Sequence, residues 1–396
     1  MLKLAVIFES SPFDRKGLFN AVHERIGHLL ETGRCEIDAF CINAWDTSFT
    51  RRMRHTPKVE RKVEYVIEDG IRYRMLWYDF SIIDHVTVEK LHKTPYFFSR
   101  FAKKVVAELK GYDAVIAHSF TGGLIAFKAF ENFGIPYFAN WHGSDVHTHP
   151  WRNNLVLNTT RTIMEKAVCN FFVSNALLET SDRITEKASK DVLYNGVSPV
   201  FRRLSDTARS DLRRKYGISS EDKVVAFVGS IVAVKNVKVL QPLFHEIRAR
   251  YRGQLKFWMV GDGKMRSLVE PMMTGDDSID VRMWGNVPAA QMPSVMNSID
   301  VLVLPSLNEG LPLVCAEAIR CGANVVGADV GGVAEVIGKE YVVPHGEGFV
   351  SVMASQVVDL LNEPVCQCVS ESFDWSRTAE KEISVISSSV PLEGWK

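Results

Sequence analysis

Hydrophobic positions gather into short apolar runs that alternate with longer segments in which apolar residues recur at helical spacing. The first run covers residues 3–8 and the second covers residues 36–42. Between them, residues 17–32 place Leu18 and Val22 on one face of a helix. Short runs that are apolar throughout are typical of strands buried on both faces of a parallel sheet. This strand–helix–strand opening predicts a doubly wound α/β sheet.

The same alternation continues through two successive series of runs. In the first series they cover residues 113–117, 137–140, 170–173 and 191–194, and in the second residues 223–229, 256–260, 281–284, 301–304 and 324–327. Residues 199–222 are polar and charged and indicate an irregular linker. The sequence therefore predicts two Rossmann-like parallel-sheet domains, residues 1–198 and 223–372, followed by a helix in residues 373–396.

One segment of the first domain has a different period. Apolar residues occupy every second position of residues 63–67 and 71–75, on either side of Asp69-Gly70. Two alternating runs joined by Asp-Gly are the signal of a β-hairpin, which we therefore expect beside the parallel strands.

The stretch with the clearest chemistry is residues 300–321, an apolar strand, a loop and a helix that Pro312 is expected to open. The N–H groups of Leu313 and Val314 would then lie at the positive end of the helix dipole, where an anion binds. Two acids flank this position, Glu309 in the loop and Glu317 in the helix. A phosphate cradle beside acids that accept hydrogen bonds from hydroxyls predicts a nucleotide-sugar site.

The run Asn308-Glu309-Gly310-Leu311-Pro312 followed by Glu317 resembles the signature of retaining glycosyltransferases of family 4. The resemblance covers most of the chain. It implies the GT-B fold, in which two doubly wound domains face a cleft and the last helix returns to the first domain. It also implies that Glu309 contacts hydroxyls of the donor sugar and that Glu317 holds the ribose hydroxyls.

The resemblance assigns further residues at strand ends. Lys235 matches the lysine that neutralises the donor diphosphate, Ser230 stands where the family has arginine, and Gly17 where it has a glycine pair. His142, in Trp141-His142-Gly143-Ser144-Asp145, matches a histidine beside the reacting sugar. The expected catalytic residues are His142 and Glu309; the donor-binding residues are Gly17, Ser230, Lys235, Gly285, Val287, Gly310, Leu311, Leu313, Val314 and Glu317; and the acceptor-side candidates are His118 and Asp145.

Composition narrows the classes of partner. The 396 residues carry no formal net charge, which favours neither nucleic acid nor membrane as a partner of the whole chain.

Seven cysteines without a Cys-x-x-Cys pair favour reduced thiols in a cytoplasmic protein. No apolar run approaches the ~18 residues of a membrane span. The opening residues do not resemble a signal peptide. No Asp-x-Asp pair stands out as a metal site, so no metal or other cofactor is expected.

Two basic stretches, residues 51–62 and residues 96–104, leave alternatives open. The second interleaves aromatic residues with Arg100, Lys103 and Lys104. Such stretches are either solvated basic faces beside a core helix or a patch for anionic lipid or a pyrophosphate-linked lipid acceptor. The second alternative would bring the protein to the inner face of the membrane.

The expected function is transfer of a sugar from a nucleoside-diphosphate sugar to a glycan or lipid-linked saccharide acceptor, with retention of configuration. Two alternatives remain at this stage. One is a nucleotide-sugar epimerase of the same fold, and the other is a non-catalytic nucleotide-sugar binding protein, to which the serine at position 230 and the single Gly17 would be suited.

Overall fold

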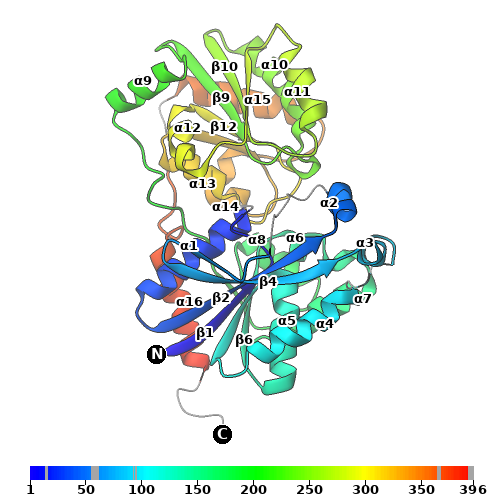
Figure 1. The fold of residues 1–396 in the computed structure, drawn as a ribbon. Helices are drawn as coiled ribbons and strands as arrows, with labels where there is room; N and C mark the ends of the chain where they lie inside the picture. Colours follow the sequence, from blue (N-terminus) through cyan, green and yellow to red (C-terminus); the bar gives the residue numbers. More distant parts are fainter. Residues whose placement is uncertain (14–16, 55–61, 92, 94–95, 364–366, 391–396) are drawn as a thin grey trace. The chain divides into compact units, whose positions relative to one another are not determined.

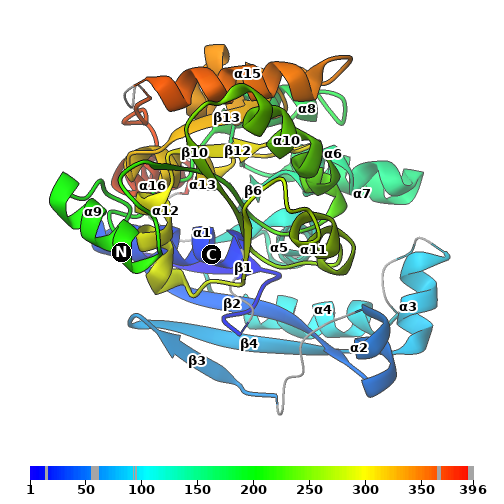
Figure 2. The ribbon, with the colours of Figure 1, turned by 90° about the horizontal axis from the view of Figure 1, so that it is seen from above.

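The computed structural model describes residues 1–13, 17–54, 62–91, 93, 96–363 and 367–390 (Figures 1 and 2). The chain divides into two compact units, each built on its own, mainly parallel sheet. The first unit comprises Met1–Asn195 and Asp374–Lys396, and the second comprises Gly196–Phe373. Two parallel-sheet α/β units are what the alternating apolar runs predict.

The sheet of the first unit has the strand order β3-β4-β2-β1-β5-β6-β7-β8. The parallel strands are β1 (Leu2–Phe8), β2 (Cys35–Asp46), β4 (Ile71–Phe80), β5 (Ala114–His118), β6 (Tyr137–Trp141), β7 (Cys169–Phe172) and β8 (Lys190–Val192). The antiparallel partner of β4 is β3 (Tyr65–Glu68), which confirms the predicted hairpin. Asp69 and Gly70 form its turn with φ angles of 48° and 80°, a region that favours glycine and tolerates aspartate.

Helices connect these strands and cover the sheet. They are α1 (Gly17–Glu31), α2 (Ser48–Arg54), α3 (Ile82–Glu89), α4 (Tyr96–Glu108), α5 (Ser119–Phe133), α6 (Ser144–His147), α7 (Asn154–Lys166), α8 (Asn175–Ser181) and α16 (Trp375–Ser389), with a 3-10 turn η1 (Pro150–Arg152). The last helix, α16, belongs to this unit although it follows the second unit in sequence. Its cap is Asp374, whose carboxylate accepts the N–H of Arg377, and it packs against α1.

A buried charge pair lies where α1 and α16 meet. Arg25 of α1 and Glu382 of α16 are both essentially inaccessible, with 3.6 Å between Arg25 Nε and Glu382 Oε2. Asn140 at the end of β6 accepts a hydrogen bond from Arg25 Nη1 at 2.5 Å and donates one to Glu382 at 3.3 Å. Burial raises the pKa of Glu382 and lowers the pKa of Arg25, and each charge partly offsets the effect on the other.

Replacement of Glu382 by alanine is therefore expected to destabilise the first unit by about 3–5 kcal/mol, because it leaves Arg25 buried without a counter-charge. Urea unfolding at neutral pH measures the change. The neighbouring Lys381→Ala is the control, since Lys381 is exposed and its contacts with Asp191 and the carbonyl of Val192 lie at the surface. Equal stability of the two variants would contradict the expectation.

The second unit has a parallel sheet in the order β11-β10-β9-β12-β13-β14. Its strands are β9 (Asp222–Val228), β10 (Gln254–Val260), β11 (Val281–Gly285), β12 (Val301–Leu304), β13 (Asn324–Ala328) and β14 (Val342–Val343). Its helices are α9 (Asp206–Lys215), α10 (Leu240–Arg250), α11 (Arg266–Thr274), α12 (Met292–Ser298), α13 (Leu313–Arg320), α14 (Val333–Ile337) and α15 (Phe349–Asn362), and its 3-10 turns are η2 (Ala233–Lys235), η3 (Val237–Val239), η4 (Ala289–Gln291) and η5 (Lys339–Tyr341). The core lies between the sheet and helices α10 and α15.

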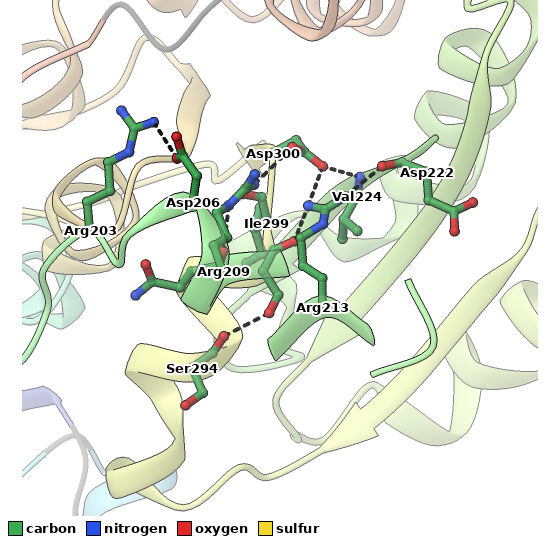
Figure 3. Close-up of polar contacts among 11 residues, drawn as sticks. Arg203, Asp206, Arg209, Arg213, Asp222, Val224, Ser294, Ile299 and Asp300 are labelled. Atoms are coloured by element: carbon green, nitrogen blue, oxygen red, sulfur yellow. Dashed lines mark hydrogen bonds and ion pairs between the residues drawn. The ribbon is translucent and has the colours of Figure 1, made fainter. Parts of the chain in front are cut away.

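The predicted irregular linker contains helix α9, so that part of the prediction is wrong. Ser205 caps the helix by accepting the N–H of Ala208. Two arginines of α9 then bind Asp300, the residue directly before β12. Arg209 Nη2 and Arg213 Nη1 lie 3.0 and 2.9 Å from its two carboxylate oxygens (Figure 3). The polar composition concealed this helix because charge pairs rather than an apolar stripe attach it to the unit.

Candidate functional site

The centre of the candidate site is a contact between Lys235 and Glu309, two residues that the sequence singles out. Lys235 ends η2, which follows β9, and Glu309 lies in the loop after β12. Lys235 Nζ is 2.5 Å from Glu309 Oε1, and the side chains are 21% and 9% exposed. The loops are also joined by the backbone, where the N–H of Leu307 donates to the carbonyl of Val234 at 2.8 Å. Since β9 and β12 are neighbours in the sheet, their carboxyl ends bring the two loops together.

Two glycines after β13 support the loop that carries Glu309. Gly331 has a φ of 51°, and a Cβ placed there would lie 1.8 Å from the carbonyl oxygen of Glu309. The N–H of Gly332 donates to the carbonyl of Gly310 at 3.1 Å. The sequence indicated only a turn at Gly331-Gly332. The structure shows that only a residue without a side chain fits at position 331, because the two backbones touch.

The start of α13 differs in one respect from the sequence prediction. Pro312 occupies the cap position, with a ψ of 87°, and the helix begins at Leu313. The N–H of Leu313 donates to the carbonyl of Leu311 at 3.0 Å, so it is not free for an anion as predicted. The reason is that Pro312, with a φ of −80° and a ψ of 87°, is the central residue of an inverse γ-turn just before the helix. Gly310 and Leu311 lie in that loop, and Val314 lies in the first turn of α13.

Glu317 lies in α13 between the buried residues Ala316 and Ala318. Burial raises the pKa of its carboxyl to about 7. A carboxyl with this pKa is partly ionised near neutral pH, and no described residue donates a hydrogen bond to it. A ligand that donates such hydrogen bonds would offset the cost of burying the ionised form.

The raised pKa predicts a pH-dependent cost to stability. A carboxyl with a higher pKa in the folded chain binds its proton more tightly there, so stability falls as pH rises from about 4.5 to about 7. Glu317→Gln removes this ionisation. Relative to the unmodified protein, the variant is expected to gain stability between pH 4.5 and pH 7.5, as measured by urea unfolding at both values. A stability difference that does not change with pH would contradict the raised pKa.

Other predicted donor-binding residues lie at strand ends of the second unit. Ser230 follows β9, Gly285 ends β11 and Val287 lies in the next loop. Gly285 has a φ of 68°, and a Cβ there would lie 2.9 Å from Nη1 of Arg266. Arg266, which the sequence did not single out, is thus a basic side chain beside these predicted donor-binding residues, and it also pairs with Glu270.

The candidate residues of the first unit meet at the ends of β5 and β6, two neighbouring strands. His118 Nδ1 and His142 Nε2 are 2.9 Å apart, within hydrogen-bond distance. Burial lowers the pKa of His142 to about 3 and that of His118 well below its ordinary value. Both imidazoles are therefore neutral at pH 7. One ring nitrogen of the pair carries the shared hydrogen, which links the tautomer of His142 to that of His118.

Asp145 shapes the loop that presents His142. Its buried carboxylate accepts the N–H of His142 at 3.1 Å and the N–H of Gly143 at 2.8 Å. Its observed contacts therefore position the His142 loop. The other predicted residue of this unit, Gly17, is the first residue of α1, where an added Cβ would meet nothing within 4 Å.

Comparison with known proteins identifies the second unit. Residues 208–363 match the family model described as "Glycosyl transferases group 1". The second unit carries a group 1 glycosyltransferase domain. This domain contains Lys235, Glu309 and Glu317, the residues on which the sequence prediction of a nucleotide-sugar site depends.

Curated relatives extend the likeness into the first unit. The chain is 25% identical over 345 residues to a Bacillus subtilis glycosyltransferase named for teichuronic acid biosynthesis, TuaC, covering 86% of this chain and 83% of the relative. It is 26% identical over 279 residues to N-acetyl-alpha-D-glucosaminyl L-malate synthase of Bacillus anthracis, covering 65% of this chain and 68% of that protein.

Solved structures confirm the predicted GT-B fold class. Sucrose-phosphate synthase of Thermosynechococcus elongatus has a TM-score of 0.70 at 16% identity, covering 98% of this chain and 95% of that one. Anabaena HepE, solved in complex with UDP and glucose, has a TM-score of 0.67 at 16% identity and 98% coverage of both chains. At such identities the likeness establishes the fold and no more.

Proposed function

We propose that this protein transfers a sugar from a nucleoside-diphosphate sugar to a saccharide acceptor, with retention of configuration. The observation that carries the proposal is the contact between Lys235 and Glu309 within the group 1 glycosyltransferase domain. In this proposal the lysine binds the diphosphate and the acid binds a hydroxyl of the sugar, the two groups on either side of the bond to be broken.

Lys235 stabilises the leaving group in this proposal. Its ammonium has three N–H donors, of which the contact with Glu309 uses one. The remaining donors serve oxygens of the diphosphate, whose negative charge grows as the bond to the sugar breaks. A fixed ammonium provides this stabilisation without a metal ion, so we propose that transfer is metal-independent and needs no cofactor.

The acids and histidines position the sugar nucleotide. Glu309 accepts hydrogen bonds from hydroxyls of the donor sugar, and Glu317 accepts them from the ribose. His142, as a neutral imidazole, contacts the sugar near its anomeric carbon, and His118 fixes the tautomer of His142. Retention is proposed from the resemblance to family 4, which also suggests a glycan or lipid-linked saccharide as the acceptor.

The proposal is tested by supplying a panel of radiolabelled nucleotide sugars with and without a membrane lipid extract, in the presence and absence of EDTA. Label is expected to move to an acceptor from the extract at the same rate in EDTA. Conversion of the donor sugar without any acceptor would instead indicate an epimerase. Donor binding without either reaction would indicate a non-catalytic binding protein.

A further inference from the structure

Apolar side chains are exposed together at one place on the first unit. They belong to α2, to α3 and to the residues just after α3: Phe49, Ile82, Ile83, Val86 and Leu91. Three of them, Phe49, Ile83 and Leu91, are 59%, 62% and 58% exposed. Single exposed apolar residues are ordinary, but a group on adjoining elements marks an interaction surface. We call these five residues the α2–α3 surface.

Hydrogen bonds to the last residue of β4 hold the start of α2 close to the start of α3. The N–H of Thr47 and the hydroxyl of Thr50 both donate to the carbonyl of Phe80, at 3.5 and 3.3 Å. Helix α3 begins two residues later and packs against both α2 and α4 (Figure 2). Phe49 and Ile82 therefore lie on two helices that pack against each other at one corner of the unit.

Exposed basic side chains lie on the same elements, directly after α3 or on the adjoining α4. Arg52, Lys90, Lys93 and Arg100 are exposed, and no described residue supplies any of them with a carboxylate partner. Two acids near these elements are engaged elsewhere: Asp84 is buried and caps α3 through Ser81, and Asp79 is bound by Lys62. The side chain of Glu89, which ends α3, lies outside the described residues. Exposed apolar side chains on elements that also carry unpaired cations fit the interface of a bilayer with anionic headgroups.

The α2–α3 surface differs from the membrane patch that the sequence suggested for residues 96–104. Among the aromatic residues in stretch 96–104, Phe98 is buried, and Phe98 and Phe101 both pack on Tyr78. These rings therefore belong to the core. The side chains of Tyr96 and Phe97, and residues 55–61 of the other basic stretch, lie outside the described residues.

The position of the surface relates it to the proposed reaction. Helix α2 follows the carboxyl end of β2 and α3 follows the carboxyl end of β4, both parallel to β1. His118 and His142 lie at the carboxyl ends of β5 and β6 in the same sheet. One edge of this sheet therefore carries both the exposed apolar corner and the acceptor-side candidates.

We propose that the α2–α3 surface docks on an anionic membrane and that the acceptor is an amphiphile held in that membrane. The part that concerns the acceptor rests on the proposed glycosyl transfer, whereas the docking does not. Apolar side chains enter the interface, and the lysines and arginines of these elements bind anionic headgroups.

The test measures co-sedimentation of the full chain with phosphatidylcholine vesicles and with vesicles that contain about one third phosphatidylglycerol. Binding is expected only to the anionic vesicles. The double variant Ile82→Ser/Ile83→Ser is expected to bind at least about tenfold more weakly. Lys90→Glu/Lys93→Glu should weaken binding by a similar factor and remove its dependence on salt. The matched control is Leu268→Ser, because Leu268 is equally exposed but belongs to the second unit.

Two readouts separate docking from catalysis. Thermal shift by nucleotide sugars should be unchanged in both double variants, while transfer to the lipid extract should fall with vesicle binding. Equal binding to neutral and anionic vesicles, or no binding, would overturn the proposal. So would a dimer in sedimentation velocity that Ile82→Ser/Ile83→Ser dissociates, since a second copy would then be the occupant. Vesicle binding by a protein that transfers no sugar would leave docking supported and refute the proposed function.

Discussion

Replacement of Glu309 by alanine is expected to abolish sugar transfer, with kcat falling by about 10³-fold or more, while the protein remains folded. Glu309 is the acid that contacts Lys235 at 2.5 Å, at the proposed junction of sugar and diphosphate. Its loss removes a hydrogen-bond acceptor for the donor sugar and releases the lysine from its position. Stability should change little because Lys235 is partly exposed and can reach water.

The measurement is initial-rate transfer with the donor identified by the labelled panel, together with thermal unfolding of each variant. Glu309→Gln is the second variant, since it keeps the shape of the side chain but loses its charge. The control is Glu347→Ala, an exposed acid in the loop before α15. Near-normal transfer by Glu309→Ala would refute the role assigned to Glu309.

Replacement of Lys235 by alanine is expected to lower kcat by about 10²–10³-fold, the effect of removing one fixed donor that stabilises developing charge. The loss should also weaken donor binding, because the same ammonium contacts the diphosphate before reaction. Lys238→Ala is the matched control, as Lys238 is an exposed lysine in the next turn. A Lys238 variant as impaired as the Lys235 variant would show that general surface charge, rather than this contact, matters.

The double variant Lys235→Ala/Glu309→Ala sharpens the comparison. Residues in contact that act as a unit have non-additive effects. The double variant should therefore be about as slow as the slower single variant. If the fold-losses in kcat of the two single variants instead multiply in the double variant, the two residues act independently. That result would contradict the proposal that each residue positions the other.

The sequence predicts the parts of this structure that depend on short-range pattern. Apolar runs located the strands, and the Asp69-Gly70 turn located the hairpin. Glu309 was singled out because it flanks the predicted helix start after a strand, and Lys235 because it matches a lysine of the family that the sequence resembles. Both follow strands of a parallel sheet, where carboxyl ends meet at one edge. The likeness of residues 208–363 to a known domain supports this reading of the second unit.

What the sequence missed depends on contacts between distant segments. Gly331 is required because its backbone touches that of Glu309, which no local pattern reveals. The pairing of His118 with His142 depends on the register of two strands. Helix α9 was missed because Arg209 and Arg213 hold it through Asp300, far along the chain.

Exposed apolar residues of α3 were overlooked for a related reason. The run Ile82-Ile83 followed by Val86 has the helical spacing of a core-facing stripe. In the structure, Asp84 of the same helix is the buried residue, because its carboxylate closes the cap with Ser81. The cap turns the apolar side chains outward, and periodicity alone does not specify that direction.

The central claim is that Lys235 binds the diphosphate of a nucleotide. Isothermal titration calorimetry tests it most directly, with UDP, GDP, ADP and TDP and with the corresponding nucleosides, on the unmodified protein and on Lys235→Ala. We expect one diphosphate to bind preferentially and Lys235→Ala to weaken its binding about tenfold or more while leaving binding of the bare nucleoside unchanged. Equal affinities of both proteins for that diphosphate, or no binding of any nucleotide, would contradict the claim.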